Sequence, residues 1–282
     1  MIINWYPGHM HKASKELVKL MHKTHAFIEV LDARTPHSSS NPLLATIRGD
    51  LPCIRILSKA DLADPDATKA WHKYFTDKKN SACLINGYDS PLQRSDIVRA
   101  AKPLIKKRLA EDSPDIPRNV QLVIGGIPNA GKSTLLNQLL DRKVANTGNE
   151  PAITKGQQRV RLDEGWYLVD TPGMMWPKLE DQTCAYRLAA TGTIRNTAID
   201  SVDIAWFLAE LLIAEYPERI KERYGATENE NSAELLIEHI ARLRGCLVKG
   251  GRADLNKTSE LLLNDFRSGK LGRFTLELPE SD

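Results

Sequence analysis

A glycine-rich loop that ends in a lysine and a serine constrains this sequence more than any other feature. Residues 126–133 read GIPNAGKS, which fits the pattern G-x-x-x-x-G-K-[ST]. An apolar run at 120–124 leads into the loop and predicts a buried strand, and residues 135–140 predict the first turns of a helix. A strand, such a loop and a helix together direct backbone N–H groups at a phosphate. The sequence therefore predicts a nucleoside triphosphate site.

The residues of this loop have separate expected roles. Lys132 should reach the β- and γ-phosphates, and the Ser133 hydroxyl should bind Mg²⁺. The loop residues expected to line the same phosphate site are Asn129, Ala130, Gly131 and Thr134.

A second phosphate-sensing motif, DTPG at 170–173, stands at the end of a predicted strand. The Asp170 carboxylate should hold Mg²⁺, usually through water, and the Gly173 N–H should meet the γ-phosphate. Thr154 lies in the polar segment between the two motifs, where it can bind Mg²⁺ when a γ-phosphate is present. The spacing predicts a segment that triphosphate orders and diphosphate releases.

Base selection is expected from residues 58–61, SKAD, at the end of another predicted strand. The Asp61 carboxylate can accept hydrogen bonds from N1–H and the exocyclic amine of guanine, and adenine offers no such pair of donors. The Lys59 stem should lie against the ring. The other expected base contacts are Ser58, Ala60, Asn86 and Gly87.

Strand-like and helix-like segments alternate through the first part of the chain. Apolar runs predict strands at 26–32, 52–57, 82–85, 120–124, 157–162 and 166–169, and helical spacing falls at 42–48, 67–75 and 95–109. This alternation predicts a mostly parallel sheet with helices on both faces.

The rest of the chain is predicted to be helical. Helical patterns occur at 185–190, 202–214, 218–224, 233–243 and 258–266, before a last strand-like stretch at 274–278. We therefore expect an α/β domain at 1–178 and an all-α domain at 179–282.

Composition favours a globular protein of the cytoplasm. The four cysteines are scattered with no CxxC pair, which argues against a disulfide framework or a zinc site. No apolar run approaches the roughly 20 residues needed to cross a bilayer. The first residues lack the apolar core of a signal peptide. A net charge of +3 is too small to indicate a partner by itself.

Positive charge gathers in two zones. Lys12, Lys15, Lys19 and Lys23 stand against Glu16 alone in the first 25 residues, on a predicted amphipathic helix. Residues 242–273 carry eight Lys and Arg against three acidic residues. Two basic zones beside a nucleotide site favour RNA, and not DNA, as the partner. For the N-terminal helix alone, a solvated charged face explains the charge equally well.

Taken in chain order, the base motif, the phosphate loop, Thr154 and the DTPG motif are the GTPase motifs in rotated order. The chain resembles the circularly permuted GTPases of the YlqF (ribosome biogenesis GTPase A) family, from residues 5–10 through Asp32-Ala33-Arg34 to residues 266–273. The resemblance implies a circularly permuted Ras-like P-loop GTPase domain that binds GTP and GDP with Mg²⁺ and hydrolyses GTP. It also implies that the protein binds rRNA of the large ribosomal subunit and acts in assembly of that subunit. We expect a monomer.

Two positions bear on specificity and mechanism. Ser58 stands where the family usually carries Asn, so we expect GTP to remain preferred with affinity weakened by about 1 kcal/mol per lost contact. Met174 stands where Ras-type enzymes carry a Gln that orients water. Either hydrolysis is slow or another group acts, and the resemblance favours the second. His9 is the candidate, because an imidazole can accept a proton near neutral pH; a surface histidine is the alternative. The resemblance further implies that Asn129 helps to hold K⁺.

Three classes of function compete at this stage. One is a GTP-hydrolysing assembly factor, stimulated by ribosomal subunits, that docks on rRNA and leaves after hydrolysis. Another is a ribosome- or RNA-binding module in which nucleotide only sets the conformation. The third, a P-loop ATPase or kinase, is disfavoured by Asp61.

Overall fold

The computed structural model describes residues 3–4, 8–109, 115–140, 159–176, 178–179, 181–194, 199–225 and 229–280. The chain divides into two units, Met1–Glu180 with Glu277–Asp282, and Asp181–Leu276. The first crossing, between Glu180 and Asp181, lies two residues beyond the domain boundary expected at 178. The end of the chain, Glu277–Asp282, belongs to the first unit and not to the helical domain in which it was expected.

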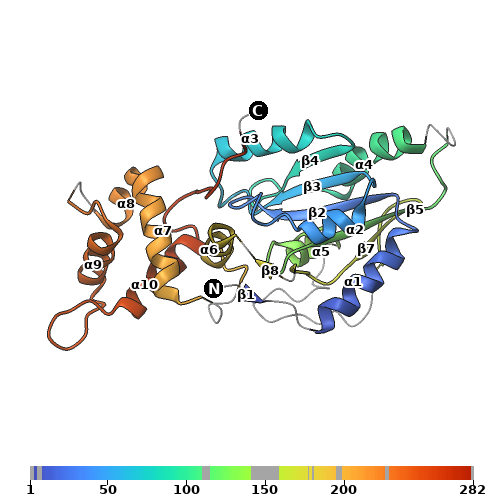
Figure 1. The fold of residues 1–282 in the computed structure, drawn as a ribbon. Helices are drawn as coiled ribbons and strands as arrows, with labels where there is room; N and C mark the ends of the chain where they lie inside the picture. The colour runs from blue at the N-terminus through green and yellow to red at the C-terminus, as the bar shows by residue number, and fades with distance from the viewer. Residues whose placement is uncertain are drawn as a thin grey trace. The chain divides into compact units, whose positions relative to one another are not determined.

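A six-stranded sheet forms the centre of the first unit (Figure 1). In spatial order its strands are β4 (Ser81–Ile85), β3 (Cys53–Ser58), β2 (Ala26–Asp32), β5 (Val120–Gly126), β7 (Trp166–Asp170) and β6 (Arg159–Asp163). Neighbours run parallel except β6 and β7, which form an antiparallel hairpin. The predicted mostly parallel sheet is therefore confirmed. A separate short ladder pairs β1 (Ile3–Asn4) with β8 (Lys178–Leu179).

The strand order brings the three site motifs to one edge of this sheet. The base motif follows β3, the phosphate loop follows β5 and the DTPG motif follows β7. β2 lies between β3 and β5 and is parallel to both. Because the carboxyl ends of parallel strands lie at the same edge, motifs far apart in sequence meet there.

Helices cover this sheet. α1 (Gly8–Met21), α2 (Pro42–Arg48) and α3 (Pro65–Thr76) lie over one face, where apolar clusters bury alternate residues of β2 and β3: Phe27, Leu31, Cys53 and Leu57. The intervening residues Ile28, Val30, Ile54 and Ile56 are also fully buried. α4 (Arg94–Leu109) and α5 (Lys132–Leu140) pack against the strands as well. Burial on both faces explains the unbroken apolar runs that marked these strands.

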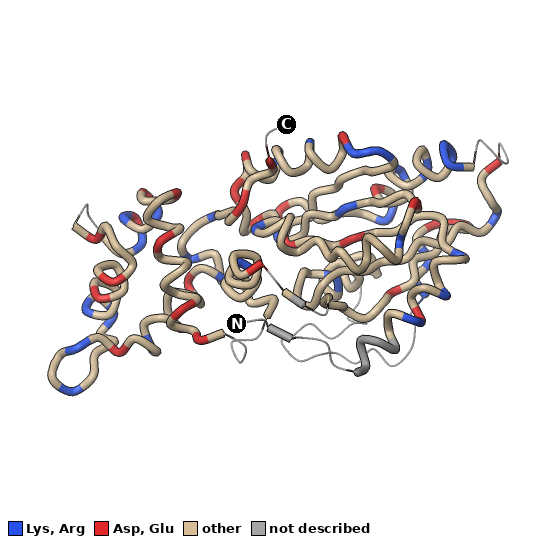
Figure 2. Tube along the Cα trace, in the orientation of Figure 1, with Lys and Arg blue, Asp and Glu red and all other residues tan. Residues whose placement is uncertain are grey.

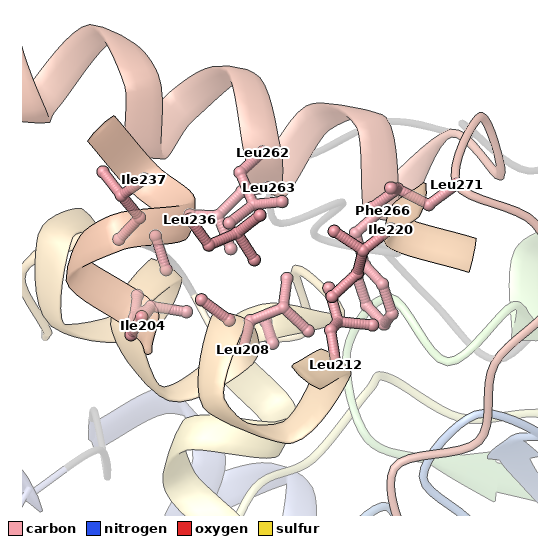
Figure 3. Close-up of a cluster of buried hydrophobic side chains, with 14 of the residues drawn as sticks. Ile204, Leu208, Leu212, Ile220, Leu236, Ile237, Leu262, Leu263, Phe266 and Leu271 are labelled. Carbon is pink, nitrogen blue, oxygen red and sulfur yellow. The ribbon is translucent and has the colours of Figure 1, made fainter. Parts of the chain in front are cut away.

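Five helices make up the second unit within the residues that the structure describes. They are α6 (Gln182–Ala190), α7 (Ser201–Glu215), α8 (Pro217–Tyr224), α9 (Ala233–Arg244) and α10 (Leu255–Arg267). Their apolar faces meet in one cluster that includes Leu208, Leu212, Leu236, Leu262 and Phe266 (Figure 3). The predicted helical nature of this part is confirmed. Across the described chain, no helix is both long and apolar enough to cross a bilayer.

The strand predicted at 274–278 is wrong. Phe274 packs into the core of the second unit, with its ring centroid 4.8 Å from that of Tyr216. The Tyr216 hydroxyl accepts from the backbone N–H of Thr275 at 3.2 Å and lies 2.9 Å from the Thr275 carbonyl oxygen, to which it donates. The alternation of apolar and polar residues in this stretch arises because its apolar side chains pack into the helical core. The backbone of Thr275 forms hydrogen bonds with the Tyr216 hydroxyl, where a strand would pair with a neighbouring strand.

A buried ionic cluster ties α8 to α10. The Asp265 carboxylate accepts from Arg223 Nε at 3.0 Å and Nη2 at 2.8 Å, and from the Tyr224 hydroxyl at 3.1 Å. Burial raises the pKa of Tyr224, and the neighbouring carboxylate raises it further, so this hydroxyl stays a donor. Asp265 therefore holds two donor side chains, Arg223 and Tyr224, that lie beside the helical core.

Replacing Asp265 with alanine should destabilise the second unit by about 2–3 kcal/mol. The loss stays below the roughly 3–5 kcal/mol typical of a fully buried pair, because water can reach part of the Arg223 side chain, which is 29% exposed. Calorimetric unfolding of the full chain measures this change. Glu260→Ala, an exposed carboxylate on the same helix, is the control. Equal melting temperatures for the two variants would contradict a stabilising role for the cluster.

Candidate functional site

The phosphate loop has a backbone that its glycine makes possible. Gly131 has a φ of +103°, and a Cβ at this position would lie 2.8 Å from Ser58 Oγ. A side chain here would therefore be strained and would also clash. Asn129, with a φ of +58°, adopts the left-handed conformation that asparagine tolerates better than most residues. The loop thus folds back on itself at the start of α5, as phosphate binding requires.

Lys132 and Asp170 lie together at this loop. Lys132 Nζ donates to Asp170 Oδ1 at 2.6 Å, and both side chains are almost completely buried. The lysine opens α5 and the aspartate ends β7, so the pair joins the two predicted phosphate motifs. Gly173 of the DTPG motif also lies close to Pro128 of the phosphate loop. A Cβ at position 173 would lie 3.2 Å from the backbone N and Cα of Pro128, so the close approach favours glycine. The phosphate loop and the DTPG motif therefore form one site.

The base motif is tied to the phosphate loop by two contacts. The Ser58 hydroxyl is within hydrogen-bond distance of the carbonyl of Leu31, at 2.9 Å, and of that of Ala130. Lys59 Nζ donates to the carbonyl oxygen of Asn129 at 2.6 Å. The serine hydroxyl thus links the base motif to the phosphate loop. What it lacks is the second polar group that could reach a base.

Asp61 is held in place by the motif after β4. Its Oδ1 accepts from the backbone N–H of Tyr88 at 2.9 Å. A Cβ on Gly87 would lie 3.0 Å from the Asp61 backbone N and 3.2 Å from its Oδ1, so this position favours glycine. The carboxylate is partly exposed, and its orientation is fixed through one oxygen. The other oxygen, Oδ2, can accept a hydrogen bond from a bound base.

The Asn86 side chain supports this motif from within. Its Oδ1 accepts from the backbone N–H of Leu92 at 3.0 Å and from Gln138 Nε2 at 3.2 Å. Asn86 is also buried. Any base contact through its amide oxygen would compete with these bonds. If Asn86 and Gly87 contact a base as predicted, we therefore expect the contact to come mainly from their backbone atoms.

Asp32 is a site residue whose role the sequence analysis did not recognise. Its Oδ2 accepts from Lys59 Nζ at 2.7 Å and from Arg34 Nη2 at 2.8 Å, and its Oδ1 accepts from Arg34 Nε at 3.0 Å. Burial opposes ionisation, but the two cations hold the pKa of Asp32 well below its usual range. The base-motif lysine is thus fixed between Asp32 and the phosphate loop. A carboxylate at the end of a buried parallel strand, the signal that found Asp61, could have found Asp32.

Met174 is part of the hydrophobic core. Only 1% of it is exposed, and it belongs to a cluster with Leu17 and Met21 of α1. Its backbone N–H donates to Gly126 at 3.1 Å, and Asn41 Nδ2 donates to its carbonyl at 2.7 Å. A thioether buried in this way cannot orient a water molecule at the phosphates.

Two predicted site residues are not tested by this geometry. Thr154 lies outside the described residues. His9 belongs to α1, whose side chains are described from Ala13 onward. Their roles stay predictions.

The residues present fit a Mg²⁺-nucleotide. The site offers a carboxylate at Asp170, a hydroxyl at Ser133 and an ammonium at Lys132, beside a loop that leaves room for backbone approach. Asp61 and the Ser58–Lys59 contacts belong to the same edge of the sheet. A phosphate-binding end and a base-binding end, reached in rotated chain order, define a circularly permuted P-loop GTPase.

Comparison with known proteins agrees with this class. The family described as "50S ribosome-binding GTPase" matches residues 121–240. The match begins in β5 and omits the earlier residues that carry the base motif, as a permuted order would cause. "Ribosome biogenesis GTPase A" of Bacillus cereus is 40% identical, covering 99% of this chain and 95% of that protein. The protein of that name from Thermotoga maritima is 30% identical, covering 99% and 95%.

Solved structures show the same likeness. A structure described as GDP-bound TM YlqF superposes with a TM-score of 0.66 at 26% identity, covering 94% of this chain and 100% of that one. GNP-bound YlqF from T. maritima gives a TM-score of 0.64 at 26% identity, covering 96% and 100%. The chain belongs to the ribosome biogenesis GTPase A family. It is a GTPase of ribosome biogenesis, and the resemblance seen in the sequence is confirmed.

Proposed function

We propose that this GTPase binds the rRNA of the large ribosomal subunit and uses GTP hydrolysis as a conformational switch during assembly of that subunit. The family description "50S ribosome-binding GTPase" supports the choice of subunit. Membership of a GTPase family argues against the alternative of a P-loop ATPase or kinase. The other alternative is a ribosome- or RNA-binding module in which nucleotide only sets the conformation, and the turnover assay below distinguishes it from the proposed function.

The observation that carries the rRNA proposal is a basic loop between α9 and α10. Lys249 and Arg252 are exposed on it, and Lys257 is exposed at the start of α10. Lys and Arg mark this loop in Figure 2. Arg267, another basic residue of the predicted zone, has internal partners: it donates to the carbonyls of Ala190 and Ala189, at 2.9 and 2.8 Å. The exposed cations of the loop support it as the site of the proposed phosphate contacts.

The basic N-terminal helix is a second candidate surface. Lys15, Lys19 and Lys23 are exposed, and Leu17 and Met21 on the opposite side are buried in the core of the first unit. The helix has one apolar and one basic face, as the spacing predicted. A solvated face and a phosphate contact remain equally consistent with this arrangement.

Hydrolysis would depend on positioning and charge. In this proposal Lys132, which lies beside Asp170, would bind β- and γ-phosphate oxygens, and the Gly173 N–H would bind the γ-phosphate. Mg²⁺, when held by Ser133, Asp170 and Thr154, would neutralise charge on the phosphates. His9 as the group that orients water, and K⁺ at Asn129, belong to this proposal.

The switch would act through the segment after Gly173. That segment leads from the site to the first crossing between the units, at Glu180 and Asp181. Movement at Gly173 on loss of the γ-phosphate would be passed to the chain that enters the second unit. A monomer in the cytoplasm remains the expected working form.

Purified large ribosomal subunits should raise GTP turnover many-fold, and small subunits should not. A steady-state phosphate-release assay measures this effect. If large subunits bind without changing turnover, the enzyme is a binding module and the switch proposal is wrong.

Charge reversal tests the rRNA surface. The double variant Lys249→Glu, Arg252→Glu should weaken binding to large subunits at least about tenfold. The slope of log K against log salt concentration should become shallower by about two, because two phosphate contacts are lost. Its matched control is Lys106→Glu, Lys107→Glu, a pair of exposed lysines at the end of α4. Equal affinities for the two double variants would remove the loop from the interface.

A further inference from the structure

The end of the chain is bound to the first unit by a buried carboxylate. Glu277 Oε1 accepts from the backbone N–H of Ser38 at 2.8 Å, and Oε2 accepts from the Ser38 hydroxyl at 2.6 Å. Trp71 Nε1 of α3 donates to the Glu277 carbonyl at 2.9 Å. Both partners are buried: Ser38 is 1% exposed and Glu277 8%. We call residues 277–280 the strap, and Figure 1 shows it beside α3.

The segment that receives the strap also supports the nucleotide site. Ser39, next to Ser38, accepts through Oγ from the Asp32 backbone N–H at 3.1 Å and donates to the Thr35 carbonyl at 2.6 Å. These bonds close residues 32–39 into a buried turn, in which Ser39 is completely buried. The position of Ser38 and that of Asp32 are therefore fixed by one set of hydrogen bonds.

Asp32 in turn holds the base motif. Its carboxylate accepts from Lys59 Nζ at 2.7 Å, and the same Nζ donates to Asn129 in the phosphate loop at 2.6 Å. The Asp61 backbone lies two residues beyond Lys59. Any displacement of the 32–39 turn would move the Asp32 carboxylate, and Lys59 would lose one of its two anchors.

The same segment reaches the DTPG motif. Asn41 Nδ2 donates to the Met174 carbonyl at 2.7 Å, and Asn41 Oδ1 caps α2 by accepting from Leu43 N–H at 2.9 Å. The buried Glu29 carboxylate accepts from the Asn41 backbone N–H at 3.0 Å. Residues 32–41 therefore contact the base motif, the chain beyond Gly173 and the strap.

We propose that Glu277 is a remote positioning residue for guanine recognition: the strap fixes the 32–41 segment, and this segment fixes Lys59 and, with it, Asp61. By linkage, guanine nucleotide and strap docking stabilise each other by the same factor. The contacts form a contiguous route from Glu277 through Ser38, Ser39 and Asp32 to Lys59.

Glu277→Ala should weaken GDP binding about fivefold, measured by titration calorimetry on the full chain. The ratio of GDP affinity to IDP affinity should also fall, because IDP lacks the exocyclic amine that Asp61 is expected to read. A structural defect without coupling to the base motif would leave this ratio unchanged. Ser38→Ala removes one of the two bonds and should give a smaller loss in the same direction.

The matched control is Glu280→Ala, an exposed carboxylate on the same strap, which should bind GDP like the unchanged protein. In the unchanged protein, GDP should also slow hydrogen exchange at the Ser38 amide, which donates to Glu277. Two results would overturn the proposal: GDP and IDP affinities of folded Glu277→Ala equal to those of Glu280→Ala, or exchange at Ser38 that GDP does not change.

Discussion

Asp61→Asn should convert a guanine-binding protein into one that prefers xanthine. The Asp61 Oδ1 bond to the Tyr88 N–H can persist with asparagine, so the new amide would place N–H donors where the second carboxylate oxygen stood. The amide N–H would then face the exocyclic amine of guanine, donor against donor, and only the remaining oxygen could accept from N1–H. We expect GDP affinity to fall about 10³-fold or more, since a site built for specific donors strongly rejects the wrong partner. Xanthine carries an acceptor in place of the amine and should bind.

Titration with GDP and XDP measures this exchange of preference. Asp64→Asn is the control, because Asp64 caps α3 three residues away and asparagine caps a helix equally well. If Asp61→Asn keeps its affinity for GDP, Asp61 does not read the base, and our assignment of the base motif fails.

Lys132→Ala should reduce GTP turnover by about 10³-fold, because it removes the cation expected to stabilise charge on the transferred phosphate. It also leaves the Asp170 carboxylate, 2.6 Å from Lys132 Nζ, without that partner. Single-turnover hydrolysis measures the loss. Preference for GDP over ADP should survive, because the base motif is untouched.

Lys106→Ala, an exposed lysine of the same unit, should hydrolyse GTP at the unchanged rate. The contrast separates a role of Lys132 in the site from a general effect of lost charge. Turnover of Lys132→Ala within a few-fold of the control would mean that GTP is hydrolysed elsewhere.

Local patterns in the sequence predicted the elements that carry the site. The strand prediction at 26–32 and the helix prediction at 42–48 coincide with β2 and α2. Burial on both faces produces the apolar run of β2, and a capping asparagine followed by proline starts α2, so each signal is local. The phosphate loop and the DTPG motif meet as expected because each follows a parallel strand of one sheet.

What the sequence could not predict depends on contacts between distant segments. Ser38 and Glu277 are 239 positions apart, and Asn41 and Met174 are 133 apart. No local pattern marks such pairs. The same limit explains residues 274–278, where apolar alternation predicted a strand and packing against Tyr216 took its place. It also explains Asn86, whose amide oxygen is engaged by Leu92 and Gln138 from two other segments.

Serine in the base motif shows how a departure from a family pattern can be partly neutral. Ser58 retains contacts with Ala130 and Leu31, so the link between the base motif and the phosphate loop persists. We therefore expect the shorter side chain to weaken nucleotide affinity only through a lost contact with the base. This is consistent with guanine-nucleotide binding by a chain that lacks the usual asparagine.

A crystal structure with Mg²⁺ and a non-hydrolysable GTP analogue tests the central claim most directly. We expect one analogue molecule with its guanine N1–H and amine at the Asp61 carboxylate and its β- and γ-phosphates at Lys132 Nζ. Electron density that places the guanine away from Asp61 while the phosphates occupy the loop would contradict a single pocket built from motifs in permuted order.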